Sequence, residues 1–506
     1  MKPSKIVMLP LDERPCNYEY PKMMPSGNFN LVLPPKDIMG DKKIAGKVDE
    51  IEAWLKSNSA DADALIVSLD TLIYGGILPS RLHHSDAEVL NKKADVLRQI
   101  KAENPNLKIY AFELIMRCPS YSSADEEPDY YELCGKEIHL YGRYEHKNRL
   151  GILTSEEEVE FNKLKKELNS EYLNDFLNRR KTNLAVLLNS LKLIKDGVVD
   201  YFIVPQDDAS VYGFTSLDQA VIREYLKSNV LHMKTAMYPS ADDTGLTLLA
   251  RAVNEINGVK PKVYVKYSSV KGEYTVPLVD DRIVAETIKY HILAIGGIQV
   301  YSLPEADILM AVNVGSKMQE FKDAITLVIP YDVERNLAEF TNYIKYALSL
   351  NKNVCLCDVA LLNKGDEELL KILASENLLL KIHAYAGWNT SSNTIGTALC
   401  QSCLYNVTGD DVTNKIFLLH RYYEDVGYMA YARSFVTETI LPPLNLHYRN
   451  AGGKTGVVSK AVETEITNYM AKNYPEISKF VEKVNVIMPW ARMFEADVTL
   501  KVKGLN

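Results

Sequence analysis

The chain has 506 residues, of which 47% are hydrophobic and 25% are charged, a balance typical of globular proteins that bury a large core. Its formal net charge is −8 and its pI is about 5.7, which argues against a nucleic acid or an anionic membrane as the main partner, because both attract basic surfaces. No apolar run approaches the roughly 20 residues that span a bilayer, no signal peptide is visible, and seven scattered cysteines fit a reducing compartment, so we expect a cytoplasmic protein.

Short apolar runs alternate with longer amphipathic segments along most of the chain. We expect strands at 5–11, 30–34, 63–69, 108–113, 201–206, 235–239, 262–267, 306–312, 353–357 and 381–385, and helices at 48–57, 85–103, 156–197, 215–228, 243–256, 282–295, 333–350 and 366–377. This alternation predicts a mostly parallel sheet covered by helices. We predict an α/β fold with a (β/α)8-like (TIM) barrel core. Ten strands exceed eight, so two of them are insertions or the chain divides into two α/β units.

Two regions depart from this alternation. The polar segment 119–180 is interpreted as an inserted helical region or lid within an α/β barrel-like catalytic domain at 1–410. Residues 411–506 are predicted to form an α-rich C-terminal appendage that ends in a strand at 496–502. Residues 10–15 and 277–283 have similar sequences, which suggests that both segments form the same kind of strand-to-helix turn.

The most informative segment runs from residue 199 to residue 210. An apolar stretch of strand length ends there at two adjacent carboxylates, Asp207 and Asp208. Residues just past the carboxyl end of a strand line the ligand crevice of α/β folds, and close carboxylates divide into one protonated and one ionised group. A helix N-cap is the alternative, although one Asp is enough for a cap. We predict that Asp207 and Asp208 are catalytic.

Other charged side chains also follow expected strands or turns. The predicted substrate-binding residues of this kind are Asp12, Glu13, Arg14, Asp70, Arg81, Asp242, Asp243 and Asp358. For Asp242 and Asp243 a helix cap is an equal alternative, because a helix begins directly after them. For Arg14 the alternative to substrate binding is a structural ion pair. For the segment that ends at Arg81 the alternative is a tight structural turn.

The loop at 385–397 presents Trp388 and Asn389 before a helix. A tryptophan ring can stack on the apolar face of a sugar beside amide and hydroxyl donors, so both residues are included among those that bind substrate. The alternative is a tryptophan that plugs the end of the sheet.

Metal and cofactor motifs are weak. Cys355, Cys357, Cys400 and Cys403 would suit a zinc site by residue type, but their apolar surroundings favour packing in the core. Neither a Walker loop nor an HExxH pair occurs. We predict no metal and no cofactor, a small-molecule or oligosaccharide substrate, and leave room for a homo-oligomer.

Five motifs carry a resemblance to a known family: PLDERP at 10–15, YGGILPSR at 74–81, PQDDA at 205–209, ADDTG at 241–245 and AGWNTSSNTIGT at 386–397. Together they resemble domain-of-unknown-function family 4127 over nearly the whole chain. That family brings no settled activity with it.

A second resemblance, of the core alone, is to the catalytic barrel of O-GlcNAc-removing hexosaminidases. It is carried by Asp207 and Asp208, the segment 31–37, the strand end at Asp358 and the loop at Trp388 and Asn389. The resemblance implies that Asp207 polarises the substrate's acetamido group and that Asp208 is the acid/base. The Glu-Gly-Phe-Tyr-Gly pattern of that family's first strand is missing here.

These observations favour a glycoside hydrolase acting on N-acetylated amino sugars by a substrate-assisted mechanism, since acetal cleavage needs a proton donor and nearby negative charge. An Asp-cluster metal-dependent hydrolase and a non-catalytic carbohydrate-binding protein are the alternatives.

Overall fold

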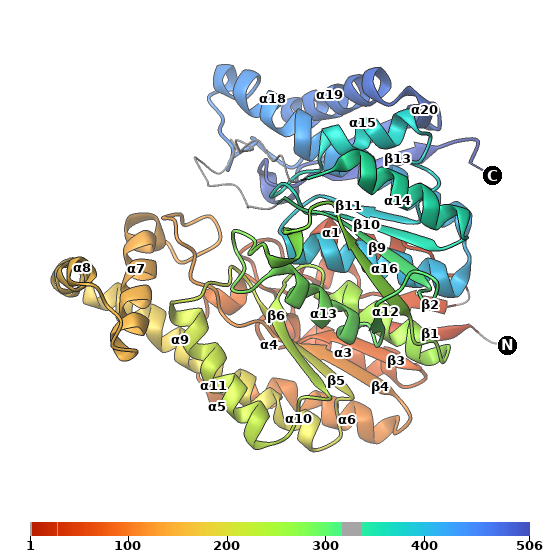
Figure 1. The fold of residues 1–506 in the computed structure, drawn as a ribbon. Helices are drawn as coiled ribbons and strands as arrows, with labels where there is room; N and C mark the ends of the chain where they lie inside the picture. The colour runs from red at the N-terminus through yellow and green to blue at the C-terminus, as the bar shows by residue number, and fades with distance from the viewer. Residues whose placement is uncertain (1–2, 28, 316–334, 506) are drawn as a thin grey trace. The chain divides into compact units, whose positions relative to one another are not determined.

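A computed structural model describes residues 3–27, 29–315 and 335–505, which divide into two compact units (Figure 1). The first unit comprises Met1–Glu13, Asn30–Leu248 and Val279–Asp281, and the second comprises Arg14–Phe29, Leu249–Leu278 and Arg282–Asn506. Each unit therefore takes a short segment from the other half of the sequence.

The first unit is built on a six-stranded sheet in the order β2-β1-β3-β4-β5-β6. Its strands are β1 (Ser4–Leu9), β2 (Phe29–Val32), β3 (Ala64–Ser68), β4 (Lys108–Phe112), β5 (Tyr201–Gln206) and β6 (Thr235–Pro239). The pairings from β1 through β3, β4 and β5 to β6 are all parallel. β3 and β5 are buried along their whole length, which explains why they are continuous apolar runs without alternation.

The second unit is built on a five-stranded sheet in the order β11-β10-β9-β7-β8. Its strands are β7 (Lys262–Tyr267), β8 (Ile298–Val300), β9 (Ile308–Asn313), β10 (Asn353–Asp358) and β11 (Ala384–Ala386). All four pairings are parallel. In this register Asn313 lies beside Asp358 at the carboxyl end of the sheet.

The two sheets share one strand order. In each, the second strand along the chain lies on one side of the first strand, and the third and later strands follow on the other side. This is the 2-1-3-4-5 order of doubly wound α/β folds. The similar segments 10–15 and 277–283 each come after the first strand of their sheet and before a helix.

The α/β class and all ten expected strands are confirmed, but the single (β/α)8-like barrel is not what the described strands form. They pair into a six-stranded and a five-stranded parallel sheet. The physical reason is the position of the third strand. In each sheet it pairs with the first strand on the side opposite to the second strand, whereas in a barrel each new strand pairs with the strand before it.

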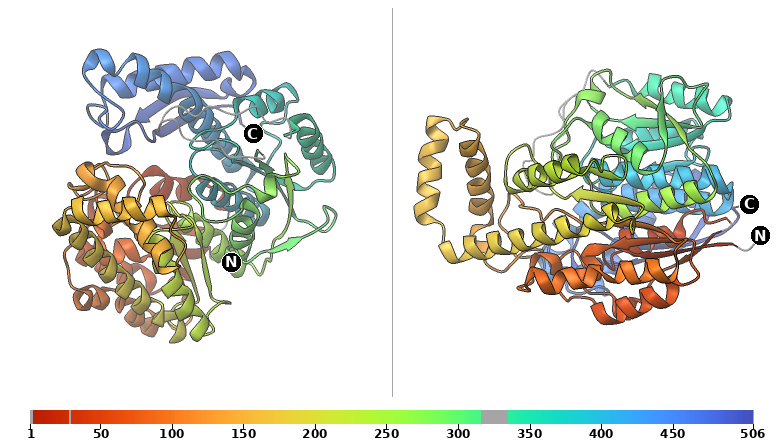
Figure 2. Two further views of the ribbon diagram at one scale, coloured as in Figure 1. Left: turned by 60° about the vertical axis from the view of Figure 1, so that its left-hand side comes forward. Right: turned by 90° about the horizontal axis from the view of Figure 1, so that it is seen from below.

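Most helices of the first unit follow the expected segments. The helix at Leu69–Tyr74 was not expected, and the helix at Tyr131–Arg149 falls in the segment 119–180 that was interpreted as an inserted helical region or lid. The helices of this unit are α3 (Val48–Ser59), α4 (Leu69–Tyr74), α5 (Ala87–Ala94), α6 (Val96–Glu103), α7 (Tyr131–Arg149), α8 (Ser155–Glu167), α9 (Ser170–Ser190), α10 (Lys192–Lys195) and α11 (Phe214–Ser228). α8 begins with a capping box between Thr154 and Glu157. Figure 1 and the right-hand view of Figure 2 show α7 and α8 projecting away from the six-stranded sheet.

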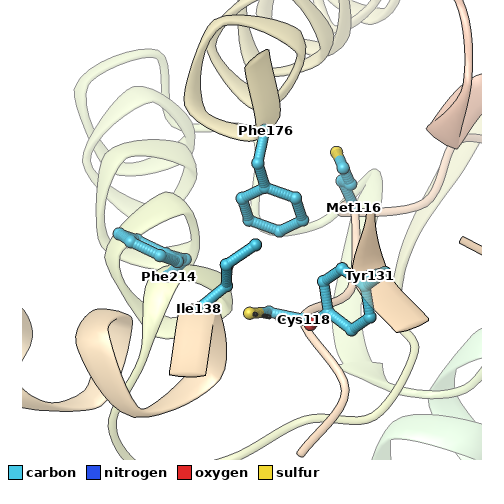
Figure 3. Close-up of a cluster of buried hydrophobic side chains, with 6 residues drawn as sticks. All are labelled: Met116, Cys118, Tyr131, Ile138, Phe176 and Phe214. Carbon is cyan, nitrogen blue, oxygen red and sulfur yellow. Dashed lines mark hydrogen bonds between the residues drawn. The ribbon is translucent and has the colours of Figure 1, made fainter. Parts of the chain in front are cut away.

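A buried apolar cluster ties this helical insertion to the segment that follows β4. It consists of Met116, Cys118, Tyr131, Ile138, Phe176 and Phe214. Figure 3 shows the ring of Phe176, from α9, pointing toward Ile138 and Phe214. Because Met116 and Cys118 flank Arg117, packing in this cluster fixes the backbone at that arginine.

The second unit contains the remaining helices and a small hairpin. Its helical segments are α1 (Pro15–Tyr18), α2 (Tyr20–Met23), α13 (Val284–Ala294), α14 (Leu337–Ser349), α15 (Glu367–Ser375), α16 (Ser391–Thr408), α17 (Asp411–Arg421), the π-helical segment Tyr422–Ala432, α18 (Arg433–Thr439), α19 (Val457–Asn473) and α20 (Pro475–Ser478). α12 (Thr244–Ile256) begins in the first unit and continues into the second. β12 (Val481–Ile487) and β13 (Asp497–Val502) pair as an antiparallel hairpin.

Tyr20 lies within a buried ionic network of the second unit. Its hydroxyl accepts a hydrogen bond from Arg421 at 2.7 Å and donates one to Glu424, and the Arg421 guanidinium lies 4.0 Å from the centre of its ring. Arg421 also pairs with Asp425 at 3.2 Å. The segment Arg14–Phe29 therefore contributes a buried side chain, Tyr20, to this unit's interior.

Across 3–27, 29–315 and 335–505, no helix has both the length and the apolarity needed to cross a membrane.

Candidate functional site

The carboxyl ends of the strands in the first unit carry most of the predicted site residues. Asp12 and Glu13 follow β1, Asp70 follows β3, and Asp207 and Asp208 follow β5. Because neighbouring parallel strands end at the same edge of a sheet, these side chains lie along one edge. Asp242 and Asp243 follow β6 at that edge, and Arg81 ends the short helical turn Pro79–Arg81.

Arg81 binds the first carboxylate of the pair. Its Nη2 lies 2.7 Å from Oδ2 of Asp207, and its Nη1 lies 3.3 Å from both Glu126 Oε2 and Glu127 Oε1. Its side chain is 3% exposed. Such a charge-assisted contact holds Asp207 in one orientation.

Arg117, just past β4, binds the second carboxylate. Its Nη1 lies 3.3 Å from Oδ2 of Asp208 and 3.8 Å from Oδ2 of Asp207. Its Nη2 and Nε lie 2.7 Å from Glu126 and Glu127 respectively. The two arginines and four carboxylates form one connected network of ion pairs, which we call the ion ring. It consists of Arg81, Arg117, Glu126, Glu127, Asp207 and Asp208.

The two catalytic candidates have different surroundings within the ion ring. Asp208 has a backbone φ of 47°, a left-handed conformation that is uncommon outside glycine and is concentrated at functional sites. Burial, followed by the charge of Asp207, raises the pKa of Asp208 to about 6. Asp207 has the closer arginine contact. Asp208 is therefore the carboxyl of the pair with the raised pKa, and Asp207 is the one with the closer arginine contact.

Asp70 lies deeper at the same edge. It is 2% exposed, and its Oδ2 accepts a hydrogen bond from the backbone N–H of Leu114 at 3.0 Å. Burial raises the pKa of Asp70 to about 7, with Arg81 and Asp207 among the charges that act on it. Burial also raises the pKa of the neighbouring Glu113. Asp70 is thus a further carboxyl group at this edge that can hold a proton near neutral pH.

Asp243 directly precedes the first residue of α12. It is fully buried, accepts hydrogen bonds from the hydroxyls of Ser240 at 2.6 Å and Thr247 at 3.0 Å, and its backbone carbonyl accepts from Thr247 N–H. Asp242 is 6% exposed. For Asp243 these contacts match the capping alternative.

The residues around β1 also have protein partners. Glu13 Oε1 accepts a hydrogen bond from the backbone N–H of Lys42 at 2.9 Å, and Asp12 is buried. Arg14 belongs to the second unit, where its guanidinium lies 4.6 Å from the centre of the Trp490 ring.

Asp358, Trp388 and Asn389 also belong to the second unit. Asp358 accepts hydrogen bonds from Asn313 Nδ2 at 2.8 Å and the Tyr385 hydroxyl at 3.0 Å. Burial, followed by the charge of Asp366, raises the pKa of Asp358 to about 7. This carboxyl is the centre of a buried hydrogen-bond network at the carboxyl end of the five-stranded sheet.

The Trp388 side chain is packed inside the second unit. It is 2% exposed, its indole N–H donates to Thr397 Oγ1 at 3.2 Å, and Tyr20 meets its ring edge-on at a centroid distance of 5.7 Å. Asn389 is also buried, and its Oδ1 accepts from the Thr390 backbone N–H at 2.7 Å. For Trp388 these contacts correspond to the core-packing alternative.

Within the described ranges, no group of three or more His, Cys, Asp or Glu side chains is arranged to hold a metal ion. All seven cysteines are free thiols. Cys355 and Cys357 lie on one strand with their sulfurs 3.9 Å apart, and both are fully buried.

Comparison with known proteins assigns the family. The profile of the family described as "Protein of unknown function (DUF4127)" matches residues 6–499. The chain belongs to this family. No curated protein matches the chain. The match confirms the family resemblance found in the five sequence motifs, and the family's description names no activity.

The three further members of the ion ring were not predicted from the sequence. Arg117 follows a predicted strand, and that position was a usable signal. Glu126 and Glu127 fall in the polar segment 119–180 that was interpreted as an insertion or lid. Their role depends on the fold of that segment, which carries no short motif.

Proposed function

We propose that the chain is a glycoside hydrolase whose acid is Asp208 and whose partner carboxyl group is Asp207. The observation that carries this proposal is the unequal pair: Asp208 has a pKa raised to about 6, beside an Asp207 that is held by Arg81 at 2.7 Å. A carboxyl of this kind can donate a proton to a leaving oxygen near neutral pH, while a fixed carboxylate stabilises positive charge that develops on the sugar.

The proposed substrates are glycosides of N-acetylated amino sugars. Asp207 orients the acetamido group, whose oxygen attacks the anomeric carbon while Asp208 protonates the departing oxygen. Water then opens the cyclic intermediate as Asp208 takes back a proton. Since the strand order differs from that of a barrel, these roles rest on the geometry of the pair in the first unit and need no contribution from Trp388.

The test is turnover of chromogenic glycosides, N-acetylhexosaminides first. Asp208→Asn should lower turnover by at least about 100-fold, the range for loss of a general acid. Asp200→Asn is the matched control, because Asp200 precedes the same strand, has the same 24% side-chain exposure and pairs with Lys108 at 2.9 Å. Equal turnover in the wild type and Asp208→Asn would refute the assignment.

Two further results separate the other functions. Activity that EDTA abolishes would point to a metal-dependent hydrolase, whereas the proposed mechanism survives chelation. Sugar binding without turnover, in both the wild type and Asp208→Asn, would indicate a carbohydrate-binding protein.

A further inference from the structure

Glu127 is the most enclosed carboxylate of the ion ring. Its side chain is 1% exposed, and its Oε1 contacts Arg117 Nε at 2.7 Å and Arg81 Nη1 at 3.3 Å. Glu126 contacts the same two arginines, but its side chain is 20% exposed. Glu127 is therefore the carboxylate of the ion ring that water screens least.

The helix α9 also holds the backbone around both arginines. Asn183 Nδ2 donates to the carbonyl of Ser80, next to Arg81, at 2.8 Å, and Arg180 Nη1 donates to the carbonyl of Arg117 at 3.4 Å. The two arginine side chains are therefore anchored at their backbone by α9 and at their tips by carboxylates of the ion ring.

We propose that Glu127 is the positioning residue of the site: through Arg81 and Arg117 it holds Asp207 and Asp208 in place and determines which of the two carries the proton. Glu127 touches neither aspartate in the ion ring and acts only through the arginines. The catalytic meaning of this role rests on the proposed function, whereas the effect on protonation does not.

The physical basis is a balance of charge around Asp208. The groups that act on its carboxyl are Asp207 and Glu126, which favour the protonated form, and Arg117 and Arg81, which favour the ionised form. Asp208 in turn acts on the Tyr121 hydroxyl. Glu127 neutralises part of the arginine charge. When its own charge is removed, the arginines stabilise ionised Asp208 more strongly, so the pKa of Asp208 falls.

The experiment compares Glu127→Gln with the wild type in two assays. In the first, the pH profile of turnover on an N-acetylhexosaminide is recorded. Protonated Asp208 is the active form, so the alkaline limb should move to lower pH by about one unit, a size typical of one charge acting across several ångströms of partly buried protein. A merely structural loss would lower the whole profile without moving this limb. Glu132→Gln, on α7 of the same insertion, is the control and should leave the limb in place.

The second assay needs no turnover. The melting temperatures of proteins with Asp208 and with Asp208→Asn are compared between pH 4 and pH 7, each with and without the Glu127→Gln substitution. Asp208 has a folded-state pKa above its unfolded value, so its contribution to stability is present at low pH and is lost as pH rises toward about 6. In the Glu127→Gln background that loss should be smaller. An unchanged pH dependence overturns the inference, even if the protein proves not to be a glycosidase.

Two variants cover a failure of Glu127→Gln to fold. Glu126→Gln should move both readouts in the same direction, because Glu126 contacts the same two arginines. Glu127→Asp retains the charge and should restore most of the wild-type pH dependence. When Glu127→Gln does not fold, the absence of a shift in Glu126→Gln would overturn the inference.

Discussion

Phe176→Ala tests whether the buried apolar cluster anchors the helix α9. Phe176 is fully buried, and its ring lies 6.0 Å, centre to centre, from the rings of both Tyr131 and Phe214. Burial of a phenylalanine side chain contributes about 2–3 kcal/mol, and each ring contact adds about 0.5–1.5 kcal/mol. With incomplete collapse of the cavity, we expect a loss of about 3–5 kcal/mol.

The assay is hydrogen exchange of peptides from α9 at increasing urea concentration. A local readout is needed because a chain with two units need not unfold in one step. Val159→Ala on α8 is the matched control: its side chain is exposed, so the change should stay within about 0.5 kcal/mol. A loss below about 1 kcal/mol for Phe176→Ala would refute the view that this cluster anchors the helix.

Two further predictions concern carboxyl groups with protein partners. Asp243→Ala removes the acceptor for the Ser240 and Thr247 hydroxyls and should lower stability by about 1–2 kcal/mol; an unchanged thermal melt would contradict the capping role. Tyr385→Phe removes the hydroxyl that donates to Asp358. Because Asp358 has a pKa raised to about 7, this hydrogen bond is charge-assisted only above that pH, so the loss in melting temperature should be larger at pH 8 than at pH 5, and equal losses would count against it.

The secondary structure was largely predictable, because the strands are apolar runs bounded by turns and the helices have an amphipathic period. β8 was missed because it has three residues with only partial burial. β12 was missed because charged residues interrupt its apolar ones. The pairing into two sheets could not be predicted in this way, since the side on which a strand joins depends on long-range packing and leaves no local signal.

The candidate site was predictable in part. The position of Asp207 and Asp208 follows from the end of an apolar strand, and the structure places them at the carboxyl edge of a parallel sheet. Their partners Glu126 and Glu127 could not be predicted from the sequence, because these contacts between distant segments form only when the insertion is folded. For Trp388 the sequence pattern was ambiguous. A tryptophan beside amide and hydroxyl side chains suits a sugar subsite, but the same pattern also occurs around a tryptophan that packs in the core.

The way the chain passes between its two units has a consequence for dissection of the protein. A fragment that starts at residue 249 contains every strand of the five-stranded sheet but lacks Tyr20, and Arg421, which is fully buried, then loses both a hydrogen-bond acceptor and an aromatic face. A single cut near the middle of the gene therefore does not yield two independent halves. Supplying residues 14–29 as a separate peptide, or grafting them onto the fragment, is the route to expressing the second unit alone.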